Sequence, residues 1–431
     1  KNAVAQELFL ITQTVDKLKK ELDKTNNLGL AKKIEMPLIK VLANMELNGI
    51  AVDLKKLSEM SKQIAKDIKK LETAIQKMAG EEFNIASPIQ LREVLFEKLE
   101  LPTQGIKKGK TGLSTSAEQL EKLHGIHPII TKIESYREVT KLQNTYIDVL
   151  PTLINKKTNR IHSTFNQAIT ATGRLSSSEP NLQNIPIRTE MGREIRKSFI
   201  AESGNTLVVA DYSQVELRIV ASLSKDKKMM EIFKDDKDIH KATAAAINGV
   251  SLGEVDKEMR RAAKEINFGV LYGMGSYGLS WRAGIPVWQA KEFINKYFEQ
   301  FKSVKEYLDK TLKLTKKQGY CETLLGRRRY IPEINSKNFQ IRSAAERMAV
   351  NHPVQGTAAD LMKMAMIDVM KEIKKLKNPA YPAYRRAGRT DRQEIKLILQ
   401  VHDELVLEVK KGDEKKIGQI VQKTMQDVIK L

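Results

Sequence analysis

A short apolar run that ends in a carboxylate constrains the fold of this chain more than any other feature. Leu207 to Ala210 are consecutive apolar residues, and Asp211 follows them directly. The run is too short for a helix and predicts a strand covered on both faces, with Asp211 at its end. A lone acid at a strand end is commonly a cap or a surface charge, so its role depends on what else reaches this edge.

A distant segment supplies a second acid. Residues 395–409 hold two β-rich runs on either side of His402, Asp403 and Glu404. This pattern predicts a hairpin with those three residues at its bend. A sheet that joined the two segments would bring Asp403 beside Asp211, as a two-metal site requires. Carboxylates without Cys or clustered His favour Mg²⁺, for which Mn²⁺ may be substituted, over zinc.

The charge of the chain indicates a polyanionic partner. Among 431 residues, 74 are Lys or Arg and 53 are Asp or Glu, which gives a net charge of +21 spread over many segments. That distribution favours nucleic acid as the partner. A basic protein that binds a membrane surface is the alternative, although no apolar run has the length of a spanning helix. The single cysteine, Cys321, excludes an internal disulfide framework and fits a reducing compartment.

The first 160 residues have a largely helical pattern with basic surfaces. The amphipathic periodicity predicts helices at 8–22, 38–46, 54–78 and 134–153. Between them, the glycine-rich loop 105–112 carries Lys107, Lys108 and Lys110. These lysines either follow a phosphate backbone or belong to an exposed flexible tip.

A polar segment precedes the Asp211 strand. Residues 170–186 are rich in hydroxyls and amides and include Arg174. Such a composition is typical of a solvent loop. The same groups also contact phosphates, sugars and minor-groove acceptors, so the segment is a candidate clamp for nucleic acid.

The segment 259–273 has the most informative helical pattern. Arg260, Lys264, Phe268 and Tyr272 recur every four residues and so form one stripe along a helix. The two cations can hold a triphosphate, and the two rings can stack on a base and cover its sugar. A solvated basic helix whose aromatic residues enter a core has the same pattern.

Three segments together resemble the polymerase motifs of the family A DNA polymerases, the bacterial DNA polymerase I type. They are residues 211–218, 260–273 and 401–404. The resemblance covers residues 35–431 and implies an α+β fold of the right-hand polymerase type, with an antiparallel palm sheet and a mainly helical thumb and fingers. It implies a remnant helix of an upstream exonuclease-like domain at 1–35, a thumb at 36–160, palm at 161–224 and 336–431, and fingers at 225–335.

The resemblance also implies a role for each matching residue. The implied metal ligands, for two Mg²⁺ ions, are Asp211, Tyr212 and Asp403. The implied catalytic residues are Asp211, Asp403, Lys264 and Glu404. The implied nucleotide-binding residues are Gln214, Glu216, His240, Arg260, Lys264, Phe268 and Tyr272. The implied DNA-binding residues are Arg174, Asn181, Gln183, Asn184, Arg347, Asn351, Gln355 and His402, with Lys107, Lys108 and Lys110 in the thumb.

The implied activity is template-directed addition of deoxynucleotides to a primer 3′-hydroxyl, in DNA replication or repair. Primer-template DNA and deoxynucleoside triphosphates are the expected partners of a monomer that binds no membrane. A cytoplasmic, nucleoid location is expected, and an organellar or viral source is also open. No proofreading acids can be identified in this chain.

Some features leave alternatives open. The chain opens on Lys1 without a methionine, so we expect a fragment of a longer protein. The segment 378–389 is longer and more basic than the usual connection before the last hairpin, and is either an extra DNA contact or a solvated insertion. A Mg²⁺-dependent nuclease would also need paired acids but not the stripe of residues 260–272. A non-catalytic DNA-binding protein would leave Asp211 and Asp403 unexplained, because acids near phosphates repel them.

Overall fold

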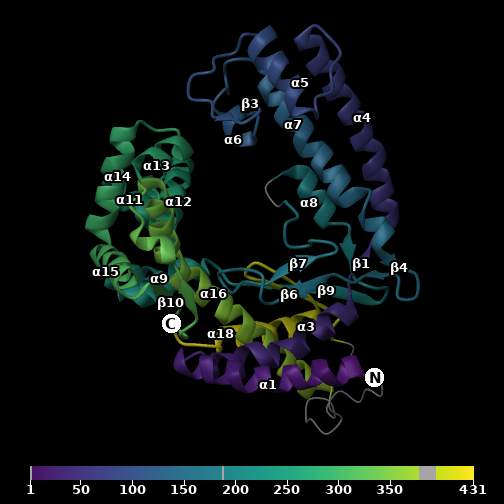
Figure 1. The fold of residues 1–431 in the computed structure, drawn as a ribbon, viewed down its shortest axis with the longest axis vertical. Coiled ribbons are helices and arrows are strands. Elements are labelled where there is room, and N and C mark those ends of the chain that lie inside the picture. Colours follow the sequence, from purple (N-terminus) through teal and green to yellow (C-terminus); the bar gives the residue numbers. More distant parts are fainter. Residues whose placement is uncertain (1, 187–188, 378–394) are drawn as a thin grey trace. The chain divides into compact units, whose positions relative to one another are not determined.

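The computed structural model describes residues 2–186, 189–377 and 395–431, which form two compact units (Figure 1). The first unit comprises Lys1–Asn48, Phe165–Ser178 and Gly204–Leu431, and the second comprises Gly49–Thr164 and Glu179–Ser203. Helices with small antiparallel sheets confirm the predicted α+β class. The predicted basic insertion at 378–389 lies outside the described residues. No described helix is both long and apolar enough to cross a bilayer.

The first unit contains a three-stranded antiparallel sheet in the order β12-β13-β9. β9 is Asn205–Asp211, β12 is Lys396–Val401 and β13 is Glu404–Lys410. β12 and β13 form the predicted hairpin, with His402 and Asp403 as its two-residue turn. In the β13–β9 register, Glu404 lies opposite Asp211. The sheet therefore brings the two acidic segments together, as the sequence predicts.

The expectation that the Asp211 strand is covered on both faces is wrong. β9 pairs with β13 along one side, and none of its residues is fully buried. Val209 is 54% exposed. A continuous apolar run does not distinguish a central strand from one that lies at the edge of the described sheet, because both need one well-packed face. On β9 that packed face lies against α18 (Glu414–Gln426).

Helices make up most of the rest of the first unit. Its N-terminal helices are α1 (Asn2–Lys24), α2 (Leu28–Leu30) and α3 (Met36–Asn48). Its short strands are β7 (Ser176–Ser178), β10 (Tyr320–Glu322), β11 (Arg328–Tyr330) and all but the first residue of β6 (Thr164–Asn166). Its other helices are α9 (Val215–Ser224), α10 (Lys227–Lys234), α11 (Ile239–Asn248), α12 (Lys257–Leu271), α13 (Ser276–Ala283), α14 (Val287–Gln300), α15 (Lys302–Gln318) and α16 (Phe339–Lys377). α12 confirms the helix predicted from the four-residue repeat.

α12 forms where its sequence supplies a start signal and an apolar face. The Asp256 side chain accepts a hydrogen bond of 2.7 Å from the Met259 N–H, which caps the first turn. Ile266 and Val270 enter a core shared with Leu217 and Val220 of α9. α12 and α9 thus share one hydrophobic core, and α9 begins at Val215, shortly after Asp211.

The second unit is built around α4 (Leu54–Ala79) and α7 (Pro128–Leu142), which pack against each other. The helix predicted at 134–153 begins earlier, because Pro128 at its first turn favours a helix start. Beyond Leu142 it continues as a π-helical turn and a 3₁₀ turn. The other elements are α5 (Pro88–Arg92), α6 (Ala117–Glu121), α8 (Glu190–Arg196), β1 (Ala51–Val52), β2 (Lys108–Gly109), β3 (Gly112–Leu113), β4 (Ile154–Asn155), β5 (Arg160–Ile161) and β8 (Phe199–Ile200).

Candidate active site

The two predicted metal acids lie at the same end of the three-stranded sheet. Asp211 ends β9, Asp403 lies in the β12–β13 turn, and the Tyr212 N–H donates to the Asp403 carbonyl at 3.1 Å. Burial raises the pKa of Asp211, and the charge of Asp403 raises it further. Burial also raises the pKa of Asp403, although Arg174 and His402 oppose the shift. Both carboxylates therefore ionise at some cost, which a bound cation would offset.

The donor set fits a hard divalent cation that keeps open positions for substrate. Among the described residues, no group of three or more His, Cys, Asp and Glu side chains could hold a metal ion. Two carboxylates alone are typical of Mg²⁺ sites that use substrate phosphates and water as further ligands. Asp211 and Asp403 thus fit Mg²⁺ or Mn²⁺ better than a structural zinc ion.

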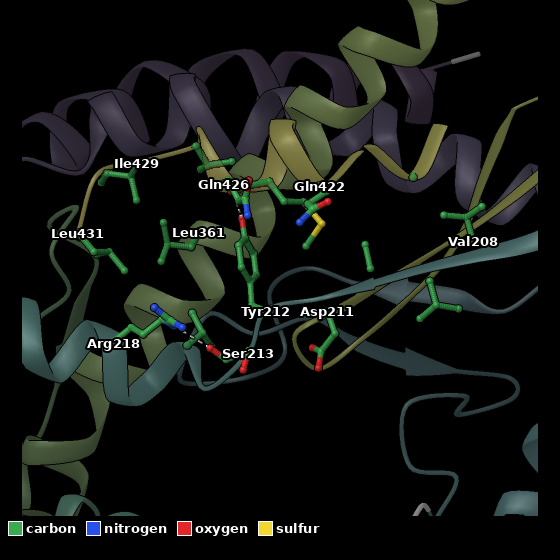
Figure 2. A pocket seen from close by; sticks show the side chains of 16 residues that line it. Val208, Asp211, Tyr212, Ser213, Arg218, Leu361, Gln422, Gln426, Ile429 and Leu431 are labelled. Atoms are coloured by element: carbon green, nitrogen blue, oxygen red, sulfur yellow. Dashed lines mark hydrogen bonds between the residues drawn. The ribbon is translucent and has the colours of Figure 1, made fainter. Parts of the chain in front are cut away.

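The Tyr212 side chain does not belong to this donor set. Its hydroxyl donates to the Met425 carbonyl at 2.6 Å, and Figure 2 shows the ring directed away from the Asp211 carboxylate. Burial raises the pKa of the Tyr212 hydroxyl. Only the main-chain carbonyl of Tyr212 is therefore available to a metal.

A cleft of about 320 Å³ joins the acids to the cationic and aromatic stripe of α12. It is lined by Asp211, Tyr212, Gln214, Val215, Glu216, His240, Arg260, Lys264, Phe268 and Asp403. Apart from Val215, every one of these residues was predicted from the sequence to bind metal or nucleotide. The structure thus gathers residues from four segments of the chain around one polar cavity.

The two cations of α12 differ in their pairing. Arg260 donates to the Asp238 carboxylate at 2.7 Å, and both side chains are about half exposed or less. Lys264 is exposed and has no hydrogen bond or ion pair with any described residue. The Lys264 ammonium is therefore free to meet an anion in the cleft.

The rings of His240, Phe268 and Tyr272 form a continuous series. The centroids of His240 and Phe268 are 5.7 Å apart, and those of Phe268 and Tyr272 are 6.5 Å apart with an interplanar angle of 25°. Phe268 and Tyr272 are partly buried, so their outer faces remain accessible. Such faces can stack on a base or a sugar.

Glu216 ties three segments together beneath the cleft. It is 8% exposed, and burial raises its pKa although the Arg174 guanidinium opposes the shift. Arg174 donates to its carboxylate at 2.7 Å, and the Tyr272 hydroxyl donates to its other oxygen. Glu216 therefore holds both the end of α12 and the polar segment that carries Arg174.

Arg174 is presented by a tight turn that needs a glycine. Gly173 has a φ of +85°, which favours glycine, and a Cβ there would lie 2.7 Å from Cδ of Arg327. The Thr170 hydroxyl donates to the Arg174 carbonyl at 2.5 Å and closes the turn. The polar segment is thus ordered around Arg174.

Three predicted DNA-binding residues form a stripe on α16. Arg347, Asn351 and Gln355 are four residues apart, and Arg347 donates to Ser343 at 2.8 Å. The Asn351 side-chain oxygen is buried and has no hydrogen-bond partner among the described residues. Arg347 also contacts the end of α12, since a Cβ on Gly273 would lie 3.1 Å from Cγ of Arg347. His402 is exposed and has a φ of +52°.

The other predicted DNA-binding residues belong to the second unit. The Asn181 side chain accepts from the main-chain N–H groups of Gln183 and Asn184, at 3.1 and 3.2 Å, so it stabilises its own turn. Gln183 is buried and Asn184 is exposed. Lys107, Lys108 and Lys110 are exposed on and beside the β2–β3 hairpin.

A larger pocket, of about 690 Å³, lies between β9 and α18 (Figure 2). Its wall is mainly apolar and includes Val208, Leu361 and Ile429, with Arg218 bonded to the Ser213 carbonyl at 3.0 Å. Asp211, Tyr212 and Val215 line both cavities, but the larger pocket lacks His240, Arg260, Lys264 and Phe268. Phosphate chemistry therefore favours the smaller, charged cleft as the candidate active site.

Sequence reasoning missed three residues that support the cleft. Asp238 pairs with Arg260, while Thr243 and Asn267 lie fully buried behind His240. Asp238 gave a recognisable signal, because it caps α11 two residues before His240. Thr243 and Asn267 gave none, since a buried polar residue on a helix is indistinguishable in sequence from an exposed one.

Comparison with known proteins agrees with this geometry. The family model of DNA polymerase family A matches residues 54–431. The chain belongs to this family. It is 48% identical over 400 residues to the thermostable DNA polymerase I of Thermus thermophilus, covering 93% of this chain and 46% of the relative. It is 45% identical over 417 residues to DNA polymerase I of Bacillus subtilis, covering 96% of this chain and 46% of the relative. This family A chain thus spans about half the length of these relatives.

A solved structure of a family A relative is also similar in fold. It is the POL domain of Pol1 from M. smegmatis in complex with DNA primer-template and dNTP. The TM-score is 0.87 at 42% identity, and the match covers 96% of this chain and 70% of that one. The polymerase-domain fold expected from the family A motifs is therefore confirmed.

Proposed function

We propose that this chain is a DNA-directed DNA polymerase that adds deoxynucleotides to a primer 3′-hydroxyl by phosphoryl transfer on two divalent ions. The observation that carries the proposal is the cleft in which Asp211 and Asp403 share one cavity with Arg260, Lys264 and Phe268. Paired acids serve metal-dependent phosphoryl transfer. The two cations can bind the phosphates of a nucleoside triphosphate, and the ring can stack on its base or sugar.

The carboxylates of Asp211 and Asp403, with the Tyr212 carbonyl, would hold Mg²⁺, or Mn²⁺ as a substitute. When bound, the metal lowers the pKa of a primer hydroxyl and neutralises charge on the leaving pyrophosphate. Glu404 lies opposite Asp211 in the sheet, and His402 precedes Asp403 in the turn. We assign these two residues to the primer end.

Arg260, Lys264 and His240 would bind the triphosphate of the incoming nucleotide. Asp238 orients the Arg260 guanidinium, and the unpaired Lys264 ammonium is the candidate proton donor to pyrophosphate. A lysine can act as both cation and acid here. Positioning and charge neutralisation then supply most of the catalysis.

Phe268 and Tyr272 would cover the new base pair, and Gln214 and Glu216 would lie near the sugar. Glu216 is fixed by Arg174 and Tyr272, so its carboxylate is a rigid obstacle to a ribose 2′-hydroxyl. A fixed side chain discriminates better than a mobile one, because the larger sugar cannot displace it without breaking two hydrogen bonds.

Primer-template DNA and deoxynucleoside triphosphates are the proposed partners of a monomer. The M. smegmatis Pol1 complex with primer-template and dNTP supports this proposal, as does the net charge of +21. Arg174, Arg347, Asn351 and Gln355 would read the minor groove. Asn181, Gln183, Asn184 and the β2–β3 lysines would contact the backbone. We also propose that residues 36–160 form the thumb, residues 225–335 the fingers, and residues 161–224 and 336–431 the palm. The proposed location of the protein is the nucleoid.

Primer extension tests the proposal. The chain is mixed with Mg²⁺, a primed DNA template and one deoxynucleotide at a time. We expect extension by one residue with the complementary nucleotide, little with the other three, and none in EDTA. Shortening of the primer would instead indicate a nuclease, and no change would indicate a non-catalytic DNA-binding protein. A matched RNA template measures template preference in the same assay.

We also propose that this chain does not proofread. In the described part of the chain, no group of three or more His, Cys, Asp and Glu side chains could hold a metal ion. A mismatched primer end should therefore persist in Mg²⁺ without nucleotides. Mg²⁺-dependent 3′ trimming that survives in the Asp211→Asn protein would overturn this proposal.

A further inference from the structure

His240 is held at the start of α11, against the nucleotide-facing ring of α12. Its main-chain N–H donates to the capping carboxylate of Asp238 at 2.9 Å. The ring is tilted against Phe268 and lines the cleft, yet the residue is only 3% exposed. Backbone and ring are thus both constrained, so the remaining variable is which ring nitrogen carries the proton.

A two-residue chain of hydrogen bonds reaches the inner nitrogen of this ring. The Thr243 hydroxyl donates to the Asn267 side-chain oxygen at 3.2 Å. The Asn267 side-chain nitrogen then lies 3.0 Å from Nδ1 of His240. Both Thr243 and Asn267 are 0% exposed. Because an amide nitrogen can only donate, Nδ1 accepts, and the proton of a neutral ring must lie on Nε2.

The surroundings of His240 keep the ring neutral. Burial lowers the pKa of His240 to about 4, and the nearby cations Arg260 and Lys264 lower it while the Asp238 carboxylate raises it. Asn267, which contacts the His240 ring from α12, carries no charge. At neutral pH the ring is therefore uncharged, and its Nε2–H can donate a hydrogen bond.

We propose that Asn267 and Thr243 are positioning residues that fix His240 in the Nε2–H tautomer, so that its ring donates one hydrogen bond to a phosphate oxygen of the incoming nucleotide. This inference rests on the proposed polymerase function. The proposed role of the neutral His240 ring differs in chemistry from the roles of Arg260 and Lys264, which supply positive charge. A neutral donor forms a directional hydrogen bond to a phosphate oxygen without supplying a positive charge, so it favours a triphosphate in one orientation.

The tautomer can be read in the free protein without any activity. In protein labelled with ¹⁵N-histidine, long-range ¹H–¹⁵N spectra distinguish the protonated from the bare nitrogen of each of the six His rings, and His240→Gln identifies the relevant signals. We expect a protonated Nε2, a bare Nδ1, and no titration between about pH 5 and 8. A protonated Nδ1, or a ring that titrates in this range, would overturn the proposal.

Substitutions separate positioning from packing. Asn267→Asp places a carboxylate opposite Nδ1, which should protonate that nitrogen and raise the His240 pKa by about 2 to 3 units, to between about 6 and 7. The matched control is Asn248→Asp on α11, whose amide bonds only to the Ala244 carbonyl of its own helix. Equal spectra for the two variants would contradict the proposal. Thr243→Val is the second variant in case a buried acid prevents folding, and it should yield a mixture of tautomers because the amide is no longer oriented.

The link to the nucleotide is tested by kinetics. In the Asn267→Asp protein, the KM for the complementary nucleotide should change with pH between about pH 6 and 8, while kcat changes less. The parent and the Asn248→Asp protein should lack this change in KM. A KM profile identical to that of the parent, in a protein whose His240 tautomer has changed, would overturn the role in nucleotide binding and leave the polymerase function intact.

Discussion

The main-chain N–H of Tyr212 donates to the carbonyl of Asp403 at 3.1 Å, which locks the end of β9 to the β12–β13 turn. This single bond joins two segments that lie far apart in the chain. It fixes the relative position of the two backbone segments that carry Asp211 and Asp403. A metal site built in this way needs little reorganisation when the cations bind.

The paired acids should destabilise the metal-free protein at neutral pH. Their pKa values are raised in the folded state, so the stability that they contribute is complete below the ordinary carboxyl pKa of about 4 and is lost as pH rises through the raised values. In EDTA at neutral pH, Asp403→Asn should therefore raise the Tm, by about 1–3 °C. The gain should disappear near about pH 4.

Calorimetry or circular dichroism measures this effect, and Asp368→Asn is the control. Asp368 belongs to an exposed ion pair with Lys371 at 2.8 Å and lies outside the cleft. Mg²⁺ should raise the Tm of the parent and of the control more than that of Asp403→Asn. A lower Tm for Asp403→Asn than for the parent in EDTA would show that the acids do not repel each other.

Phe268→Tyr should make the enzyme accept chain terminators. A phenyl ring offers no hydrogen bond near the sugar, so a nucleotide must supply its own 3′-hydroxyl, which a dideoxynucleotide lacks. One unsatisfied polar group costs about 1–3 kcal/mol, so the parent should prefer deoxynucleotides by on the order of 10- to 100-fold. The tyrosine hydroxyl should remove most of this preference. The ratio of kcat/KM values for the two nucleotide types is the measurement.

Phe233→Tyr on α10 is the matched control, because that ring lies under the Arg218 guanidinium and outside the cleft. It should leave the ratio unchanged. If the ratio is also unaltered in Phe268→Tyr, then Phe268 does not face the sugar.

Tyr272→Phe should weaken discrimination against ribonucleotides. Its hydroxyl bonds to Glu216, and without that bond the carboxylate is held by Arg174 alone. The loss of one hydrogen bond to a charged group is worth about 1.5–3 kcal/mol, of which only part affects the sugar. We expect ribonucleotide incorporation to rise by about 10-fold relative to deoxynucleotide incorporation. Single-nucleotide kinetics with both sugars measure the ratio, and an unchanged ratio would mean that Arg174 suffices.

Replacement of Lys107, Lys108 and Lys110 by Ala should weaken the salt dependence of DNA binding. Each phosphate contact contributes about 0.9 to the slope of log affinity against log salt concentration. The triple variant should therefore lose up to about 2.7 from that slope and make shorter products, with single-nucleotide insertion unchanged. The control replaces Lys310, Lys313 and Lys317, which are exposed on α15. Equal slopes for the two triple variants would make the β2–β3 loop an ordinary exposed tip.

The sequence predicted the parts of this site that depend on local pattern. The apolar run before Asp211 and the β-rich pair around Asp403 each predict strands, and the four-residue repeat in α12 predicts a helix. The pairing of β13 with β9 brings the two acidic segments together, and residues of all three segments line one cleft. The exposure of β9 was not predictable, because an apolar run reports hydrophobicity and not the number of strand neighbours. Pro128 favours the observed start of α7. The prediction placed the start at residue 134 because it followed the amphipathic periodicity and not this proline.

Contacts between distant polar residues were also beyond sequence reasoning. Glu35 accepts from Lys363 at 2.9 Å and also bonds to Arg327, which in turn donates to Asp360 at 2.7 Å. The local sequence around each of these residues predicts an exposed charge on its own helix or hairpin. Only the folded chain reveals that they neutralise one another in a largely buried cluster. The same holds for Asn267, whose role depends on a ring 27 positions away.

Single-turnover chemistry with Asp211→Asn and Asp403→Asn tests the central claim most directly. Both variants are saturated with primer-template and the complementary nucleotide in Mg²⁺, and the affinity for DNA is measured in parallel, with Asp368→Asn as control. We predict that the rate of nucleotide addition falls by at least about 10²- to 10³-fold in both cleft variants, while DNA affinity stays within about threefold. Near-parental rates in either variant would contradict the assignment of these two carboxylates to catalysis.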